Sequence, residues 1–346
     1  MKILYQIPSL ETVYAARFIY EGYRNAFLDL KHEFRPLTSN DNMKEILDEF
    51  KPDIFITSLN QYYLKFINLE QLMKYRKKGM VMFTQIRPWK KTNNQFGGSD
   101  LESEIHLVQH IKKGLAGDIF FHWLEQDDPT MQGFTKTTGF PFHTVLLAAD
   151  THLYFPEFDE RFVADISYVG SLLPDKREFM KENLSPLFKR YKVKVYGSDW
   201  TLGNKVQGYL QKVGQYFNIN PLKTIRKLTL PLGDEHKVYT SSTISLNIHE
   251  IHQRQFGSDF NERTFKILAS GGFEITDNVA ILRRYFTDKE LVIAQNTNDW
   301  FEKIEYFVKY PNKRLPIIAA GKKKVLEKHT YHNRVKQFLK LYEKFK

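Results

Sequence analysis

Residues 165–198 read DISYVGSLLPDKREFMKENLSPLFKRYKVKVYGS, and this stretch decides the expected fold. It begins with a strand pattern that ends in Gly-Ser, continues with a helix pattern over residues 177–191, and ends in a second strand pattern over residues 192–198. Strands that alternate with helices at this spacing are typical of parallel sheets that helices cover on both faces. The stretch therefore predicts an α/β domain with a parallel sheet.

The same alternation runs through the rest of the chain. The other expected strands are residues 1–7, 32–37, 53–59, 80–86, 118–123, 243–249, 273–277 and 291–294. The other expected helices are residues 12–30, 42–50, 69–79, 101–114, 261–270, 298–309 and 334–345. We expect two doubly wound, Rossmann-like domains that face each other across a cleft, over residues 1–155 and 156–330. Residues 331–346 would form a C-terminal helix, which could cross back to the first domain.

Composition narrows the class of protein. A chain of 346 residues exceeds one ordinary core, and 42% hydrophobic residues indicate a globular protein. The absence of cysteine excludes disulfides, cysteine-ligated zinc and thiolate catalysis. No apolar run approaches the length of a membrane span, and the N-terminus does not resemble a signal peptide. We expect a cytoplasmic protein, with contact to a membrane surface left open.

The positive charge is concentrated in the second half. The net charge of the chain is +11, whereas residues 1–160 carry 18 Lys and Arg against 21 Asp and Glu. Residues 161–346 therefore hold 33 basic and 19 acidic residues. One interpretation is solubility alone, and the other is that the second half binds phosphate.

Two strand–loop–helix junctions in the second half could bind an anion. At the first, Gly170 and Ser171 end a strand and Arg177 opens a helix, an arrangement that suits a diphosphate. At the second, Asn261 can cap a helix in which Glu262 complements the helix dipole and Arg263 opposes it. Because a cation at a helix N-terminus is favourable when an anion lies there, we expect both junctions to hold one diphosphate. An ordinary capped turn is the alternative at each.

These junctions carry a resemblance. The stretch NERTFKILASGGFEITDN at 261–278, preceded by TSSTISLNIH at 240–249 and followed by HTYHNR at 329–334, resembles the C-terminal domain of CgeB-like, spore-maturation type glycosyltransferases. The similarity covers roughly residues 165–340. It implies the GT-B fold, a nucleotide-sugar donor site on the second domain and an acceptor site on the first. It also implies that the protein is an enzyme, a hexosyltransferase-like glycosyltransferase.

A fainter resemblance is to the phage DNA β-glucosyltransferase, which shares the fold. Ser171 and Arg177 match the spacing of a Ser and an Arg in that enzyme, and Arg263 matches a second Arg. Two positions depart from its pattern, because Lys266 stands where it has a ribose-binding Glu and Gln85 where it has the proposed catalytic Asp. Its Ser-Glu-Thr segment is similar to Ser9, Leu10, Glu11 and Thr12.

The two positions that depart from the pattern of the DNA β-glucosyltransferase change the roles that we expect for nearby residues. Lys266 cannot accept hydrogen bonds from ribose, so Glu262 is the substitute, or Lys266 contacts phosphate. Gln85 cannot act as a general base, so Glu11 is the candidate base of an inverting reaction, ahead of Asp100 and Glu102. In a retaining reaction Gln85 would only contact sugar or acceptor. The expected donor-binding residues are Ser9, Gly170, Ser171, Arg177, Gly197, His249, Asn261, Glu262, Arg263, Thr264 and Lys266.

The sequence thus predicts a transferase that moves a sugar from a nucleotide diphosphate, UDP first, to a hydroxyl of a surface glycan, protein or small molecule. Positive side chains would stabilise the leaving diphosphate, so no metal or other cofactor is expected. Residues 87–100 could form an acceptor loop. One alternative is a transferase acting on hydroxymethylated DNA bases, which the acidic balance of residues 1–160 disfavours. The other is a non-catalytic homologue that binds nucleotide or glycan.

Overall fold

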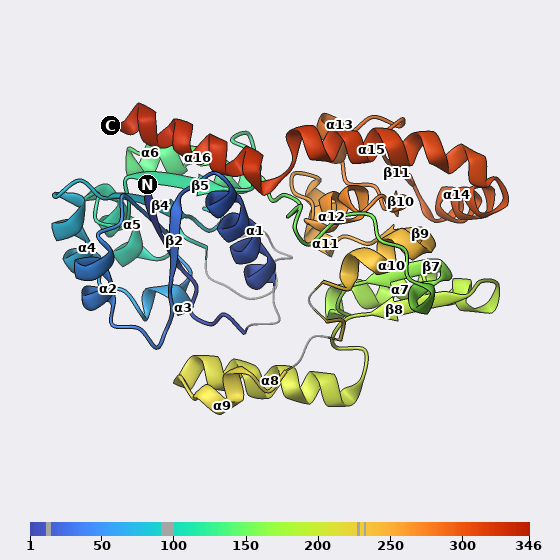
Figure 1. Cartoon of the computed structure of the whole chain (residues 1–346), viewed down its shortest axis with the longest axis horizontal. Helices are drawn as coiled ribbons and strands as arrows, with labels where there is room; N and C mark the ends of the chain where they lie inside the picture. The colour runs from blue at the N-terminus through green and yellow to red at the C-terminus, as the bar shows by residue number, and fades with distance from the viewer. Residues whose placement is uncertain (12–14, 91–99, 227–228, 232) are drawn as a thin grey trace. The chain divides into compact units, whose positions relative to one another are not determined.

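A computed structural model of the chain describes residues 1–11, 15–90, 100–226, 229–231 and 233–346 (Figure 1). The chain divides into two compact units. The first unit comprises Met1–Leu146, Lys212–Thr224 and His332–Lys346, and the second comprises Leu147–Gln211 and Ile225–Tyr331. Each unit contains one parallel sheet with helices on both faces, as the sequence predicts.

The sheet of the first unit has the strand order β2-β1-β3-β4-β5-β6, and every pair is parallel. Its strands are β1 (Lys2–Gln6), β2 (Glu33–Leu37), β3 (Ile54–Ser58), β4 (Val81–Gln85), β5 (Ile119–His122) and β6 (Phe142–Thr144). Its helices are α1 (Ala15–Asp29), α2 (Met43–Phe50), α3 (Gln61–Leu64), α4 (Leu69–Arg76), α5 (Ile105–Lys112), α6 (Phe134–Thr138), α9 (Asn220–Lys223) and α16 (Tyr331–Phe345). Residues 12–14 and 91–99, which belong to an expected helix and the expected acceptor loop, lie outside the described residues.

Strand alternation separates the two faces of this sheet. Leu4, Phe55 and Met82 are in register on neighbouring strands and pack against α2 and α4. On the other face, Phe338 of α16 has its ring 5.0 Å from that of Phe83, 4.9 Å from that of Phe121 and 5.3 Å from that of Tyr23 in α1. Phe338 is fully buried, and burial of such a side chain contributes roughly 1.5–3 kcal/mol. The C-terminal helix is therefore part of the core of the first unit.

The sheet of the second unit has the order β11-β10-β9-β7-β8 and is also parallel throughout. Its strands are β7 (Ala164–Val169), β8 (Val193–Tyr196), β9 (Ser242–Asn247), β10 (Glu274–Thr276) and β11 (Val292–Ile293). Its helices are α7 (Arg177–Asn183), α10 (Glu235–Ser241), α11 (Ile251–Phe256), α12 (Arg263–Ala269), α13 (Leu282–Tyr285), α14 (Thr297–Lys309) and α15 (Arg314–Lys328). Helix α8 (Leu202–Phe217) contributes residues to both units.

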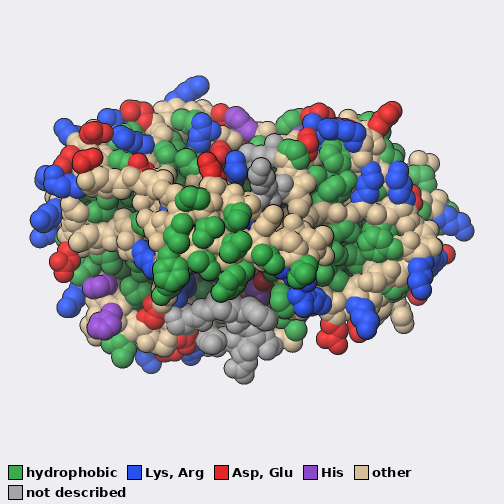
Figure 2. Space-filling view, turned by 90° about the horizontal axis from the view of Figure 1, so that it is seen from below, with side chains coloured by type: hydrophobic (Ala, Val, Ile, Leu, Met, Phe, Trp, Pro, Cys, Tyr) green, Lys and Arg blue, Asp and Glu red, His purple; other side chains and the backbone are tan. Residues whose placement is uncertain are grey.

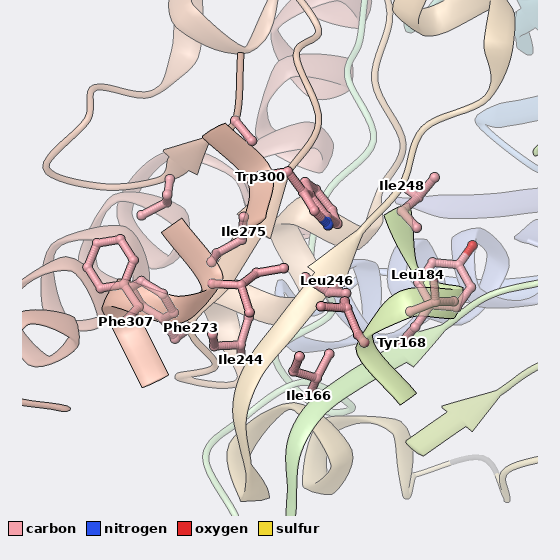
Figure 3. Packing of buried hydrophobic residues seen from close by; sticks show 14 of the residues in the cluster. Ile166, Tyr168, Leu184, Ile244, Leu246, Ile248, Phe273, Ile275, Trp300 and Phe307 are labelled. Atoms are coloured by element: carbon pink, nitrogen blue, oxygen red, sulfur yellow. The ribbon is translucent and has the colours of Figure 1, made fainter. Parts of the chain in front are cut away.

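The two faces of the second sheet differ in polarity. One face carries the apolar core that Figure 3 shows, in which Ile166, Leu246 and Ile275 pack with Trp300 and Phe307 of α14. The opposite face, which α10 and α12 cover, carries buried polar side chains, namely Ser167, Ser245, Asn247, Glu274 and Thr276. A buried polar side chain costs free energy unless it forms hydrogen bonds, so these residues are fixed by their partners. This polar face leads to the carboxyl ends of β7, β9 and β10.

One expected helix is shorter than the sequence pattern indicates. The pattern over residues 177–191 predicts one helix, but α7 ends at Asn183 and a 3₁₀ turn follows at Ser185–Lys189. Pro186 explains the difference, because proline has no backbone N–H to donate to the preceding turn. Strand β6 and helices α3, α6, α8, α9, α10, α11, α13 and α15 were not among the expected elements. Across the described residues, no helix combines the length and the hydrophobicity that crossing a membrane requires.

Candidate active site

The carboxyl edge of the second sheet brings together residues that the sequence predicts for the donor site. Gly170 follows β7, and a Cβ atom there would lie 2.7 Å from Nη2 of Arg263 and 2.6 Å from the hydroxyl of Tyr168. Gly197 follows β8 with φ at +141°, and a Cβ atom there would lie 2.1 Å from the carbonyl oxygen of Gly170. Only glycine fits at position 197, and a larger residue at position 170 would displace the ends of the Arg263 and Tyr168 side chains. The two glycines thus let the loops after β7 and β8 close up against Arg263.

Two cationic side chains converge at this edge. Nη1 of Arg263 donates to Oδ1 of Asn247 at 2.7 Å and lies 3.4 Å from the carbonyl oxygen of Ile248. Nζ of Lys176 donates to the same carbonyl oxygen at 3.3 Å. Lys176 is buried, and the guanidinium of Arg263 lies over the ring of Tyr168 at 5.3 Å from its centre. Among the described residues, neither cation has a carboxylate within ion-pair distance.

The environment of Lys176 is unfavourable for its charge. Burial, and after it the positive charge of Arg263, lower the pKa of Lys176 to about 8, although Glu250, Asp175 and Asp277 act in the opposite direction. Buried like charges are costly unless an opposite charge compensates them. An anion at the end of β9 would provide that compensation.

A histidine–carboxylate pair lies beside these cations. Nδ1 of His249 is 2.6 Å from Oδ1 of Asp277, whose carboxylate also accepts the backbone N–H of His249. Burial lowers the pKa of His249 despite its carboxylate partner. Burial would raise the pKa of Asp277, but its bonds to His249 and the charge of Arg254 hold it below its usual range. Nε2 of His249 is buried and has no hydrogen-bond partner among the described residues. The ring nitrogen is therefore available to a bound group.

The start of α12 is close to what the sequence predicts. Oδ1 of Asn261 accepts the backbone N–H of Arg263 at 3.1 Å, as a helix cap does, although α12 begins two residues later than expected. Lys266 forms an ion pair with Glu262 one turn earlier, and its ammonium lies 3.9 Å from Oε2 of Glu235. Because two carboxylates hold Lys266, its ammonium serves as a counter-ion inside the unit. Oε2 of Glu262 is buried, and none of the residues that the structure describes forms a hydrogen bond with it.

Behind Arg263 lies a buried hydrogen-bonded cluster. Nδ2 of Asn247 donates to Oγ1 of Thr264 at 2.9 Å and to Oε1 of Glu274 at 2.8 Å, and Thr264 also donates to that oxygen. Burial raises the pKa of Glu274 to about 7, against the effect of its hydrogen bonds. In the structure Thr264 helps to orient Asn247, and its expected contact with the donor stays a prediction. Asn247 in turn orients the guanidinium of Arg263.

Ser171 and Arg177 have different surroundings. Oγ of Ser171 is 2.7 Å from Oγ of Ser198, so the loops after β7 and β8 are tied together beside Gly170. The side chain of Arg177 is exposed, and no contact among the described residues joins it to Arg263. Lys176, which the sequence analysis missed, takes the inward position. Its sequence signal is a base that directly follows the Pro174-Asp175 turn at the start of a helix.

The three remaining predicted residues belong to the first unit. Ser9 and Glu11 follow β1, and the backbone N–H of Glu11 lies 3.4 Å from Oγ of Ser9. Glu11 is exposed, and Gln85 is the partly exposed last residue of β4. Both β1 and β4 are strands of one parallel sheet, so these residues lie at its carboxyl edge. Their roles as base and sugar contact stay predictions.

Comparison with known sequences supports the resemblance. Residues 176–340 match a family described as "Glycosyl transferase-like". Spore protein CgeB of Bacillus subtilis (strain 168) is 24% identical over 182 residues, which are 50% of this chain and 52% of that protein. The chain thus spans about half the length of the curated relative that it matches.

Comparison with solved structures supports the fold. Sucrose-phosphate synthase from Thermosynechococcus elongatus has a TM-score of 0.64 at 11% identity, over 99% of this chain and 98% of that chain. The catalytic domain of starch synthase IV from Arabidopsis thaliana, bound to ADP and acarbose, has a TM-score of 0.65 at 10% identity, over 99% of each chain. An alpha-glucosyltransferase in complex with UDP and a 13-mer DNA containing an HMU base has a TM-score of 0.63 at 12% identity, again over 99% of each chain. Residues 176–340 are therefore a glycosyl transferase-like region in a chain with the GT-B fold, which confirms the resemblance to CgeB-like glycosyltransferases.

Proposed function

We propose that this chain is a glycosyltransferase whose second unit binds the diphosphate of a nucleotide sugar between Arg263 and Lys176. The observation that carries the proposal is the convergence of these two cations on one carbonyl oxygen at the end of β9. In α/β sheets of this type, ligands bind at the carboxyl ends of the strands. A diphosphate is the anion that matches a guanidinium and an ammonium placed side by side.

The same pair explains how the reaction would be catalysed. Transfer of the sugar leaves negative charge on the departing diphosphate, and fixed cations stabilise charge that develops in the transition state. Arg263 is held in place by Asn247, so its guanidinium needs little reorganisation. Because two protein cations can neutralise the leaving group, we propose that transfer needs no divalent metal.

Two buried polar atoms in the second unit suggest which residues bind the other parts of the donor. Oε2 of Glu262, which has no hydrogen-bond partner in the described part of the chain, can accept a hydrogen bond from the ribose, and Nε2 of His249 can contact the sugar or the phosphate. We take UDP as the first candidate nucleotide, because several of the similar structures are complexes with UDP. The first unit would bind the acceptor, a glycan, protein or small molecule, with Glu11 as the base of an inverting reaction.

The first test is thermal stabilisation of the wild-type chain by UDP, GDP, TDP, CDP and ADP, in EDTA and then with Mg²⁺. We expect one nucleotide to raise the melting temperature in EDTA, because a ligand that binds only the folded state stabilises it. The stabilisation should be lost in Arg263→Ala and Lys176→Met, and retained in Lys181→Ala, which removes an exposed cation from α7.

Three further results would decide against parts of the proposal. Loss of stabilisation in Arg177→Ala but not in Lys176→Met would assign the diphosphate to the residue that sequence spacing favours. No stabilisation by any nucleotide at millimolar concentration would rule out the donor site. If the chain binds a nucleotide but neither releases free sugar from the donor nor transfers sugar to an acceptor, it is a non-catalytic homologue.

A further inference from the structure

Helix α8 has its polarity reversed relative to a normal surface helix. Its inward side carries small and polar residues, with Gly208 against the guanidinium of Arg226, Gly214 against Leu222, and Gln211 fully buried. Its outward side carries large apolar residues. A surface helix of a globular protein normally buries its apolar side and exposes its polar side. The outward side of α8 therefore calls for a partner.

The exposed apolar residues form one continuous stripe. Leu202, Val206, Tyr209 and Tyr216 are exposed, and the partly buried Val213 lies between the two tyrosines in the sequence. These five residues follow one another at intervals of four and three, which places them on the same side of the helix. Leu202 is 78% exposed, Tyr209 69% and Tyr216 67%, and Phe217 extends the stripe. Hydrophobic side chains gather on the molecular face seen in Figure 2, which is the side on which Figure 1 draws α8. Contiguous exposed apolar patches usually mark interaction surfaces.

The charges beside the stripe indicate what it binds. Lys205 and Lys212 are exposed and lie seven residues apart, so both flank the stripe along the same edge. Between Asp199 and Asp234 the sequence contains five Lys or Arg and no Asp or Glu. Arg226 is paired with Asp199, and Lys223 is bonded to Ser39, so these two cations hold the segment in place. Lys205 and Lys212 are thus positioned to meet an external anionic surface.

We propose that α8 docks this chain on the surface of an anionic lipid bilayer. An interfacial helix of this kind lies in the plane of the membrane, with leucine and aromatic side chains at the acyl boundary and lysines beside the headgroups. Tyr209 and Tyr216 combine an apolar ring with a polar hydroxyl, which suits that boundary. The long lysine stems reach from the edge of the stripe to the phosphates.

A second copy of this chain is a less favourable occupant. If two α8 stripes packed together, the lysines of both copies would lie along one interface, and the segment contains no acidic side chain to pair with them. A bilayer with anionic lipids offers an acyl region for the apolar side chains and negatively charged headgroups for the lysines. The docking does not depend on the identity of the sugar donor.

The test is co-sedimentation of the full-length chain with vesicles. One set is phosphatidylcholine alone and the other contains phosphatidylglycerol as well. We expect wild-type chain to bind the anionic vesicles more strongly, and Tyr209→Glu to lower that binding at least about tenfold. Lys205→Gln and Lys212→Gln should each weaken binding to the anionic vesicles about fivefold, and high salt should do the same. Ile105→Glu, which changes a 69% exposed apolar residue on α5, is the matched control and should bind as wild type does.

Folding and self-association are measured on the same variants. Since Tyr209, Lys205 and Lys212 are exposed, each variant should keep the melting temperature of the wild type. Light scattering after size exclusion gives the oligomeric state. Equal binding of wild type and Tyr209→Glu to anionic vesicles would overturn the proposal. So would a wild-type dimer that Tyr209→Glu converts to a monomer without any vesicle binding, since the stripe would then be an interface between copies.

Discussion

Replacing Arg263 with methionine is expected to lower kcat/KM for sugar transfer by about 10²–10³-fold, the range seen when one fixed donor to a developing anion is removed. The guanidinium is held by Asn247 and lies beside Gly170, so a neutral side chain of similar length leaves the loop geometry unchanged. The readout is release of the nucleotide diphosphate from the sugar donor that the thermal test identifies. A larger effect on kcat than on the affinity for donor would show that Arg263 acts on the leaving group.

Two variants make this result specific. Arg263→Lys keeps the charge but loses the planar fork that binds two oxygens at once, so it should recover only part of the rate. Lys181→Ala removes an exposed cation of α7 and should leave the rate unchanged. Unchanged turnover in Arg263→Met, with the melting temperature also unchanged, would show that the diphosphate binds elsewhere.

The sequence was sufficient to predict two α/β units with parallel sheets, because the signals for strands and helices lie in short stretches of sequence. Buried parallel strands such as Ile54–Ser58 appear as short apolar runs, and Asn42 caps α2 where the sequence predicts a helix start. Gly79 marks the end of the next expected helix less well, because α4 ends at Arg76. Pro186 is a local signal as well, and the 3₁₀ turn that follows α7 shows its effect. Helix α8 was missed although its apolar residues recur at helical spacing, because Gly203, Gly208 and Gly214 disfavour a helix there. An amphipathic pattern shows that a helix has two sides, but not which side faces inward.

The candidate site was predicted only in part, for a geometric reason. Arg263 was predicted because a cation at a helix N-terminus is unfavourable unless an anion binds there. The structure places Arg263 at the carboxyl edge of the second sheet. The choice between Lys176 and Arg177 could not be made from spacing, because one residue corresponds to about 100° of rotation at a helix start. The partner of His249, Asp277, follows β10 and lies 28 residues away along the chain. Contacts between strand ends depend on strand order, which sequence patterns do not specify.

Lys176 is expected to make both stability and ligand binding depend on pH above neutrality. Its pKa in the folded chain is about 8, lowered by burial and then by Arg263, whereas the pKa of an unfolded lysine is about 10.4. Between these values the unfolded chain binds more protons, so the free energy of unfolding rises with pH through this window, by about 3 kcal/mol in total. Lys176→Met has no such group, so it should be more stable than wild type at pH 7 and show a flatter pH profile of stability.

Binding of a nucleoside diphosphate should show the opposite dependence. The diphosphate favours the charged ammonium, so the affinity of wild type should fall as pH rises above about 8, by up to tenfold per pH unit. Phosphate groups have already completed their ionisation, near pH 6, below this window, so the ligand does not contribute to the change. Calorimetric titration of wild type and Lys176→Met from pH 7 to pH 10 measures it, with Lys181→Met as the control for an exposed lysine. If both variants bind with the same pH profile as wild type, Lys176 does not contact the diphosphate. Another cation must then bind the diphosphate together with Arg263.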